Sequence, residues 1–157
     1  MVLPAPLVPS GPANDEIWYT SSDGNIVKPH STSALPTIVS NTYVDGKGII
    51  KFETDVTSIG YRAFYNCSGL TSIIIPNSVT SIKISAFTGC SGLTSVTIPN
   101  SVTSIEISAF NGCSGLTSVI IPNSVSSIGN YAFKDCSGLT SISYTGTITQ
   151  YNAITKG

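Results

Sequence analysis

The sequence is poor in charged residues. Only 10 % of its 157 residues are charged, against roughly 25 % in an average soluble domain. Lys and Arg together number 7 and are scattered, so no basic face for nucleic acid is expected. A coiled coil or long helix would be rich in glutamate, and Glu occurs only three times. Low net charge with a hydrophobic fraction of 41 % also excludes an intrinsically disordered chain.

Long hydrophobic runs are also missing. The longest purely aliphatic runs, residues 73–75 and 119–121, are far shorter than the roughly 20 residues of a membrane-spanning helix. Residues 1–13 have no basic start and contain four prolines, so we predict an extended linker or tail and not a signal peptide. A removed leader, a boundary chosen for expression or a linker between domains would each produce such a start.

Side chains suited to catalysis or metal binding are scarce. The single histidine, His30, is expected in a solvent-exposed loop, and no nucleophile elbow accompanies it. The cysteines lack the close C-x₂-C pairs of zinc sites. No glycine-rich phosphate loop occurs. We therefore expect no enzymatic activity, no cofactor and no metal site.

A strict repeat occupies most of the chain. Ala-Phe and Gly-Leu pairs recur in four units, and Ile-Pro-Asn-Ser-Val recurs in three. The period is 23 residues, marked by Cys67, Cys90, Cys113 and Cys136. A fixed period of this length indicates a solenoid, in which each unit packs only on its neighbours.

Each unit is predicted to contain a strand, a shorter extended piece and a tight turn, with no helix. Residues 70–75 are β-branched and end at Pro76, which is typical of a strand, and residues 78–82 form the shorter piece. Residues 86–92 contain glycines where a positive φ is expected. Lys83 and Glu106 occupy one repeat position, so we expect a solvated ion pair between them.

The pattern L-x-x-I-x-I-P-x-S-V-x-S-I-x-x-x-A-F-x-x-C-x-G, over roughly residues 47–146, resembles the BspA-like leucine-rich repeat of bacterial surface proteins. The resemblance implies a mainly β, right-handed solenoid with parallel strands stacked on its concave face. It also implies short extended structure, in place of helices, on the other side. Finally, it implies a cell-surface or secreted bacterial protein that adheres to host matrix proteins or to other cells.

Both ends of the repeat array are predicted to be capped, because a solenoid otherwise exposes strand edges and apolar surface. The predicted parts are a linker or tail (1–13), an N-terminal β cap (14–46), the repeats (47–144) and a C-terminal cap (145–157). We expect two hairpins in the first cap, with turns at 21–24 and 45–46 and with Trp18 as the main apolar anchor. Residues 47–52 are expected to occupy the strand position of the first repeat. The C-terminal cap is predicted to be a short helix, thin enough to leave edge-to-edge dimerisation open.

The strand face that points away from the core is the best candidate for a functional surface. We call it the concave strand face, and its positions are Ser72, Ile74, Ser95, Thr97, Ser118, Ile120, Ser141 and Ser143. Its small side chains and regularly spaced hydroxyls would let a partner approach closely and form hydrogen bonds. The alternative is a plain hydroxyl surface suited to solubility and strand propensity. A second candidate patch near the cap consists of Tyr61, Arg62 and Tyr65.

The repeat places the four cysteines in one column. Neighbouring strands lie about 4.8 Å apart, which is within the Cα distance of a disulfide, but side chains in register point in parallel and a bridge would distort the stack. We expect a structural ladder of buried free thiols. A partial disulfide is the alternative, because the number is even and an extracellular location favours oxidation.

Three functions are consistent with these features. The first is a non-enzymatic interaction module that adheres to a protein partner through the concave strand face. The second is polysaccharide binding by the same face, against which stands its lack of aromatic stacking platforms. The third is a structural spacer or self-association unit. Fold alone does not decide among them.

Overall fold

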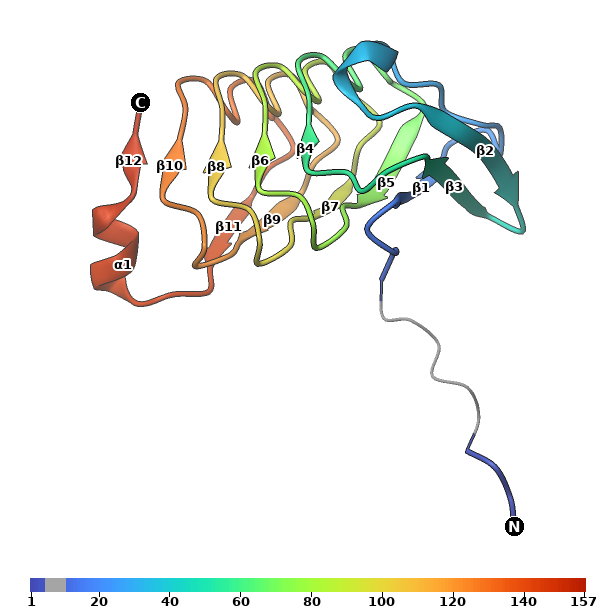
Figure 1. Cartoon of the computed structure of the whole chain (residues 1–157). Coiled ribbons are helices and arrows are strands. Elements are labelled where there is room, and N and C mark those ends of the chain that lie inside the picture. The colour runs from blue at the N-terminus through green and yellow to red at the C-terminus, as the bar shows by residue number, and fades with distance from the viewer. Residues whose placement is uncertain (5–10) are drawn as a thin grey trace.

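The computed structural model describes residues 1–4 and 11–157, which form short strands and one short α-helix wound into a solenoid (Figure 1). In chain order the elements are β1 (Glu16–Ser21), η1 (Thr32–Ala34), β2 (Ile38–Val44), β3 (Lys47–Phe52), β4 (Ser58–Ile59), β5 (Leu70–Ile74), β6 (Ser81–Ile82), β7 (Ser95–Thr97), β8 (Ser104–Ile105), β9 (Ser118–Ile121), β10 (Ser127–Ile128), β11 (Ser141–Tyr144), α1 (Ile148–Ala153) and β12 (Thr155–Lys156). The mainly β solenoid predicted from the repeat is confirmed. The tail predicted for residues 1–13 lies partly outside the described residues.

Two rows of parallel strands run along the solenoid. In one row β5 pairs with β7 and β9 pairs with β11. In the other row β4, β6, β8, β10 and β12 pair in sequence. Residues 23 positions apart lie opposite each other, as Ser81 and Ser104 do. Equivalent side chains of successive repeats therefore stack in columns.

The core lies between the two rows and is built from such columns. Phe64, Phe87, Phe110 and Phe133 stack with nearly parallel rings, and their centroids are 5.4, 5.1 and 5.4 Å apart. The first three rings are fully buried, whereas Phe133 is half-buried at the C-terminal end. Columns of Ile, Leu, Val and Ala fill the remaining space. Each repeat thus supplies one layer of a continuous apolar core.

The turn before each cysteine uses left-handed backbone at two positions per repeat. One set consists of Arg62, Ser85, Ser108 and Tyr131, and the other of Asn66, Gly89, Gly112 and Asp135. The predicted positive φ is therefore confirmed at Gly89, where φ is 75°. Gly60 serves a different purpose, because a Cβ there would lie 2.1 Å from the carbonyl oxygen of Ala34 in the cap.

The N-terminal cap contains one of the two predicted hairpins. Strands β2 and β3 pair across Asp45 and Gly46, whose φ angles of 50° and 80° suit a tight hairpin turn. The other predicted hairpin is wrong, because β1 pairs with β3 and β5 and residues 25–28 form no strand. This segment is instead held by side chains: the Tyr19 hydroxyl accepts from the Val27 N–H at 3.2 Å.

Two further expectations for the cap need correction. Residues 47–52 do not stack directly on β5, because β1 lies between β3 and β5 and is antiparallel to both. Trp18 is not the apolar anchor either. Strand alternation turns Ile17 and Tyr19 into the core, where both are fully buried, and turns Trp18 outward to a half-buried position.

The C-terminal cap contains the predicted short helix, α1. Thr147 and Gln150 form a capping box at its start: Thr147 Oγ1 accepts from the Gln150 N–H at 3.2 Å, and Gln150 Oε1 accepts from the Thr147 N–H at 2.8 Å. Strand β12 then returns to pair with β10, which the sequence pattern did not indicate. Within the described part of the chain, no helix is long and apolar enough to cross a membrane.

Candidate functional site

The structure arranges the predicted concave strand face in two registered pairs of strands. Ser72 and Ile74 lie opposite Ser95 and Thr97. One repeat further on, Ser118 and Ile120 lie opposite Ser141 and Ser143. All positions from Ser95 onward are exposed, and Ile120 has 60 % of its surface accessible. The sequence pattern therefore places these eight residues correctly on the outward side of the strands, and their role in binding stays a prediction.

The first rung of this face differs from the others, because β1 lies beside it. Ser72 and Ile74 are half-buried. The Ser72 hydroxyl hydrogen-bonds that of Thr20 at 2.6 Å, and Ile74 lies opposite Trp18 in the β1–β5 pairing. The cap thus continues the face beyond the repeats instead of covering it.

The cap adds functional candidates that the sequence did not reveal. Residues opposite each other in antiparallel strands share a face, so Trp18 and its β3 partner Ile49 lie on the same side as Ile74. Lys47 Nζ lies 3.1 Å from the centroid of the Trp18 ring, a cation–π contact. The alternation of Ile17, Trp18 and Tyr19 along a strand is the sequence feature that indicates an outward-facing Trp18. The eight predicted positions carry no aromatic side chain, as expected, but Trp18 lies next to them on the cap.

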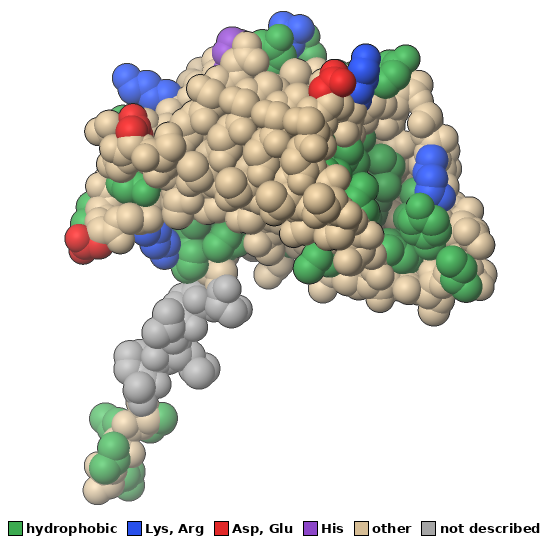
Figure 2. Space-filling model, turned by 180° about the vertical axis from the view of Figure 1, so that it is seen from behind, with side chains coloured by type: hydrophobic (Ala, Val, Ile, Leu, Met, Phe, Trp, Pro, Cys, Tyr) green, Lys and Arg blue, Asp and Glu red, His purple; other side chains and the backbone are tan. Residues whose placement is uncertain are grey.

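Charge on this surface is confined to the cap. Lys51 Nζ lies 3.5 Å from Asp15 Oδ2 and 3.7 Å from Glu16 Oε1, and all three side chains are partly exposed. The repeats offer hydroxyl and aliphatic side chains between β5 and β11. Figure 2 shows the molecule from behind, with Lys, Arg, Asp and Glu at the margins of a broad, mainly uncharged surface. A partner that covers such a surface desolvates few charges, and it offsets the cost of burying the hydroxyls by hydrogen-bonding them.

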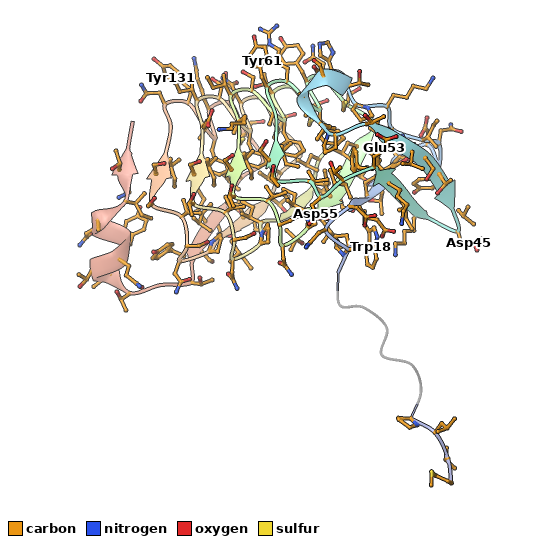
Figure 3. The ribbon with its side chains drawn as sticks, viewed as in Figure 1. Trp18, Asp45, Glu53, Asp55, Tyr61 and Tyr131 are labelled. Carbon is orange, nitrogen blue, oxygen red and sulfur yellow. The ribbon has the colours of Figure 1, made fainter. Side chains whose placement is uncertain are left out.

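The second predicted patch is brought together by the turn after β4. The guanidinium carbon of Arg62 lies 5.1 Å from the Tyr61 ring centroid and 4.8 Å from that of Tyr65. The His30 ring lies 5.3 Å from Tyr65, and the His30 N–H donates to the Ala63 carbonyl at 2.8 Å. His30 is exposed, as predicted. Figure 3 shows Tyr61 at the upper edge of the solenoid and Trp18 at the lower edge.

The cysteines form the predicted ladder, and all four are free thiols. The Sγ atoms of Cys90, Cys113 and Cys136 donate to the carbonyl oxygens of Phe64, Phe87 and Phe110 at 2.9, 3.2 and 3.1 Å. Cys67 is half-buried and not buried as expected, since only the cap loop covers it. Burial raises the pKa of the Cys67 thiol to about 11 and raises the pKa of Cys90 further. The Cys67 and Cys90 thiols are thus protonated at neutral pH.

Two hollows adjoin these surfaces. A cavity of about 600 Å³ lies between the cap and the first repeats, with Leu35, Pro36 and Tyr61 in its wall. A cavity of about 300 Å³ lies at the C-terminal end, with Phe133, Ile142 and Tyr151 in its wall. In Figure 2 hydrophobic side chains gather in a hollow at this end. The described residues contain no group of three or more His, Cys, Asp or Glu able to hold a metal ion.

Comparison with solved structures gives several similar bacterial proteins. A leucine-rich repeat protein from Bacteroides ovatus is 34 % identical, with a TM-score of 0.55, and the match covers 82 % of this chain and 40 % of that one. One from Bacteroides capillosus is 24 % identical, with a TM-score of 0.55 and coverages of 86 % and 97 %. A leucine-rich cell surface protein from Faecalibacterium prausnitzii is 32 % identical, with a TM-score of 0.46 and coverages of 66 % and 34 %. The chain thus spans less than half of two of these proteins.

Among curated proteins, none matches this chain. The family model for the BspA type leucine rich repeat region matches residues 47–154 in six copies. That segment contains every repeat-derived strand from β4 to β11 and most of the C-terminal cap. The chain therefore belongs to the family of BspA-type leucine-rich repeat proteins.

Proposed function

We propose that this chain is a non-enzymatic module that binds a protein partner through the concave strand face, at a bacterial cell surface or after secretion. Adhesion is the form of binding that the family resemblance implies. The observation that supports the proposal is the continuity of the face. Small, exposed hydroxyl and aliphatic side chains extend from Ser143 to Ser95, half-buried Ser72 and Ile74 follow, and Trp18 and Ile49 continue the surface onto the cap.

The composition of this surface fits a protein partner. Binding energy at protein interfaces is concentrated in a few aromatic or cationic residues, and neighbouring contacts mainly exclude water. Trp18 with Lys47 supplies such an anchor, and the hydroxyl columns supply a flat surround that donates and accepts hydrogen bonds. The strands are held by their neighbours and by a close-packed core, so the surface is preorganised before binding.

A binding screen against immobilised matrix proteins and polysaccharides tests the proposal. We expect saturable binding to a protein, weakened at least tenfold by Ser95→Arg with Ser118→Arg, and by Trp18→Ala. Thr103→Arg is the matched control, because Thr103 is an exposed hydroxyl residue that precedes β8 in the other row of strands. Unchanged binding by the double variant would refute the assignment to the concave strand face. Saturable binding to a polysaccharide alone would replace a protein partner with a glycan.

Self-association is a second candidate function, supported by the C-terminal end. Strand β11 pairs with β9 on one side only, among the described residues, and the neighbouring cavity of about 300 Å³ is lined mainly by apolar side chains. An unpaired strand edge beside apolar surface favours pairing with a second chain. Sedimentation equilibrium over a range of concentrations should show a dimer that Ile142→Asp abolishes. A monomer at all concentrations would remove this candidate.

A further inference from the structure

A cluster of aromatic and cationic side chains occupies the edge of the solenoid remote from Trp18. Tyr61 and Arg62 are exposed, and Tyr61 has 54 % of its surface accessible. Arg62 lies against both the Tyr61 and the Tyr65 ring, and His30 lies against Tyr65. Figure 3 shows Tyr61 projecting outward from this edge. These four residues, which we call the tyrosine–arginine cluster, are separate from the concave strand face.

The repeat fold does not require this cluster. The position of Arg62 is filled by Ser85 and Ser108 in the two central repeats, and that of Tyr61 by Ile84 and Ile107. Arg62 has a left-handed φ of 55°, and this conformation is shared by Ser85, Ser108 and Tyr131 and belongs to the turn of every repeat. The turn therefore imposes the backbone at this position but accepts serine, tyrosine or arginine, and neither the turn nor the core requires a guanidinium there.

The guanidinium of Arg62 is available to a ligand. It forms no ion pair with any carboxylate of the described residues, whereas Lys83 nearby is paired with Glu106 at 3.0 Å. The two tyrosine rings hold the guanidinium by cation–π contacts and limit its conformations. A planar, restrained guanidinium is suited to bidentate binding of a carboxylate.

Hollows on both sides of the cluster indicate an elongated, hydroxyl-rich ligand. Tyr61 borders the cavity of about 600 Å³, whose wall also carries the hydroxyl residues Ser31, Ser33, Thr57 and Ser58. Tyr65 and His30 border a second cavity, of about 400 Å³. Hydroxyl side chains donate and accept hydrogen bonds, as sugar hydroxyls do, and exposed tyrosine rings offer flat apolar surfaces with a polar tip.

We propose that the tyrosine–arginine cluster binds an acidic saccharide chain. Arg62 binds a sugar carboxylate, Tyr61 and Tyr65 contact the apolar faces of sugar rings, and the serine and threonine hydroxyls of the larger cavity bind neighbouring sugar hydroxyls. The wall of the larger cavity combines these hydroxyls with apolar residues and with the Lys83–Glu106 ion pair, so an acidic peptide is the competing ligand and is included in the test.

Titration calorimetry with an oligogalacturonate and with its fully methyl-esterified form tests this proposal. The two probes share one sugar backbone and differ at the carboxyl groups, which are charged in the acid and neutral methyl esters in the other. We expect saturable binding of the acidic oligomer, at least tenfold weaker binding of the ester, and an affinity for the acid that falls as salt is raised. No saturable binding of the acid, or equal binding of both forms, would overturn the proposal.

Variants taken from the other repeats keep the fold intact in this test. Arg62→Ser and Tyr61→Ile introduce residues that the central repeats already carry at these positions. Each is expected to weaken binding at least tenfold with an unchanged thermal midpoint. Tyr131→Ser is the matched control, because Tyr131 is an exposed aromatic residue at the position in the last repeat that corresponds to Arg62. This variant should bind the oligogalacturonate as tightly as the unchanged protein does. Full binding by Arg62→Ser, or tighter binding of a polyglutamate peptide than of the oligogalacturonate, would contradict a saccharide site.

Discussion

Replacing Phe87 with alanine should remove a large part of the stability of the solenoid. The ring is fully buried and is stacked on Phe64 at 5.4 Å and on Phe110 at 5.1 Å. Truncation of a buried phenylalanine costs about 3–5 kcal/mol, and each lost ring pair contributes roughly 0.5–1.5 kcal/mol beyond the buried area. We therefore expect Phe87→Ala to lower the free energy of unfolding by about 4–5 kcal/mol, near the upper end of that range.

Phe133 provides the internal comparison, because it has the same chemistry at the open end of the column. It is half-buried and stacks on Phe110 alone, so we expect Phe133→Ala to cost about 2 kcal/mol, roughly half as much. Urea unfolding followed by circular dichroism measures both. With a slope of about 2 kcal/mol per molar urea, Phe87→Ala should lower the midpoint by roughly 2 M. Equal losses for the two variants would refute the idea that the stability lies in continuous columns.

Three further tests concern a buried thiol, an ion pair between repeats and a glycine at the cap. Burial raises the pKa of Cys67 from 9.0 to about 11, so the Cys67 contribution to the unfolding free energy should be full below pH 9 and fall between pH 9 and 11. Because the pKa of Cys90 is raised as well, Cys67→Ala should reduce the fall seen in urea titrations at each pH without abolishing it. A double-mutant cycle on the partly exposed Lys83–Glu106 pair should give a coupling free energy below about 1 kcal/mol. A larger value would contradict the expectation that water screens the pair. Gly60→Ala, which forces a Cβ onto the Ala34 carbonyl, should cost about 1–3 kcal/mol, and a neutral result would mean that the cap moves freely.

The repeats could be predicted from the sequence because each side chain acts in a column. The positions of Ile82 and Phe87 carry the same residue types in every repeat, 23 residues apart. Each layer therefore buries the same positions, and four repeats give four independent indications of which residues face the core. The ion pair between Lys83 and Glu106 followed from the same period. The helix at residues 148–153 was also accessible, since Thr147 and Gln150 have capping-box spacing.

The N-terminal cap could not be predicted in the same way. Its central strand, β1, pairs with β3 and β5 through contacts between residues far apart in the sequence: Tyr19 lies opposite Gly48, 29 positions away, and opposite Ile73, 54 positions away. Local turn signals after β1 favoured a hairpin that tertiary pairing overrode. The prediction for Trp18 fails for the same reason: the size of its ring favours the core, whereas strand alternation turns it outward. The continuation of the concave strand face onto the cap depends on that pairing.

The insertion of β1 between two strands also determines how the chain carries mechanical load. Tension on the residues before β1 is transmitted to ladders on both flanks, which join it to β3 and to β5. Force directed along β1 is shared by these hydrogen bonds, because they lie perpendicular to the antiparallel strands. Strand β12, by contrast, is two residues long and, within the described part of the chain, pairs with β10 alone. The N-terminal end is therefore the stronger point of attachment under flow or traction, and rupture should begin at the C-terminal turns.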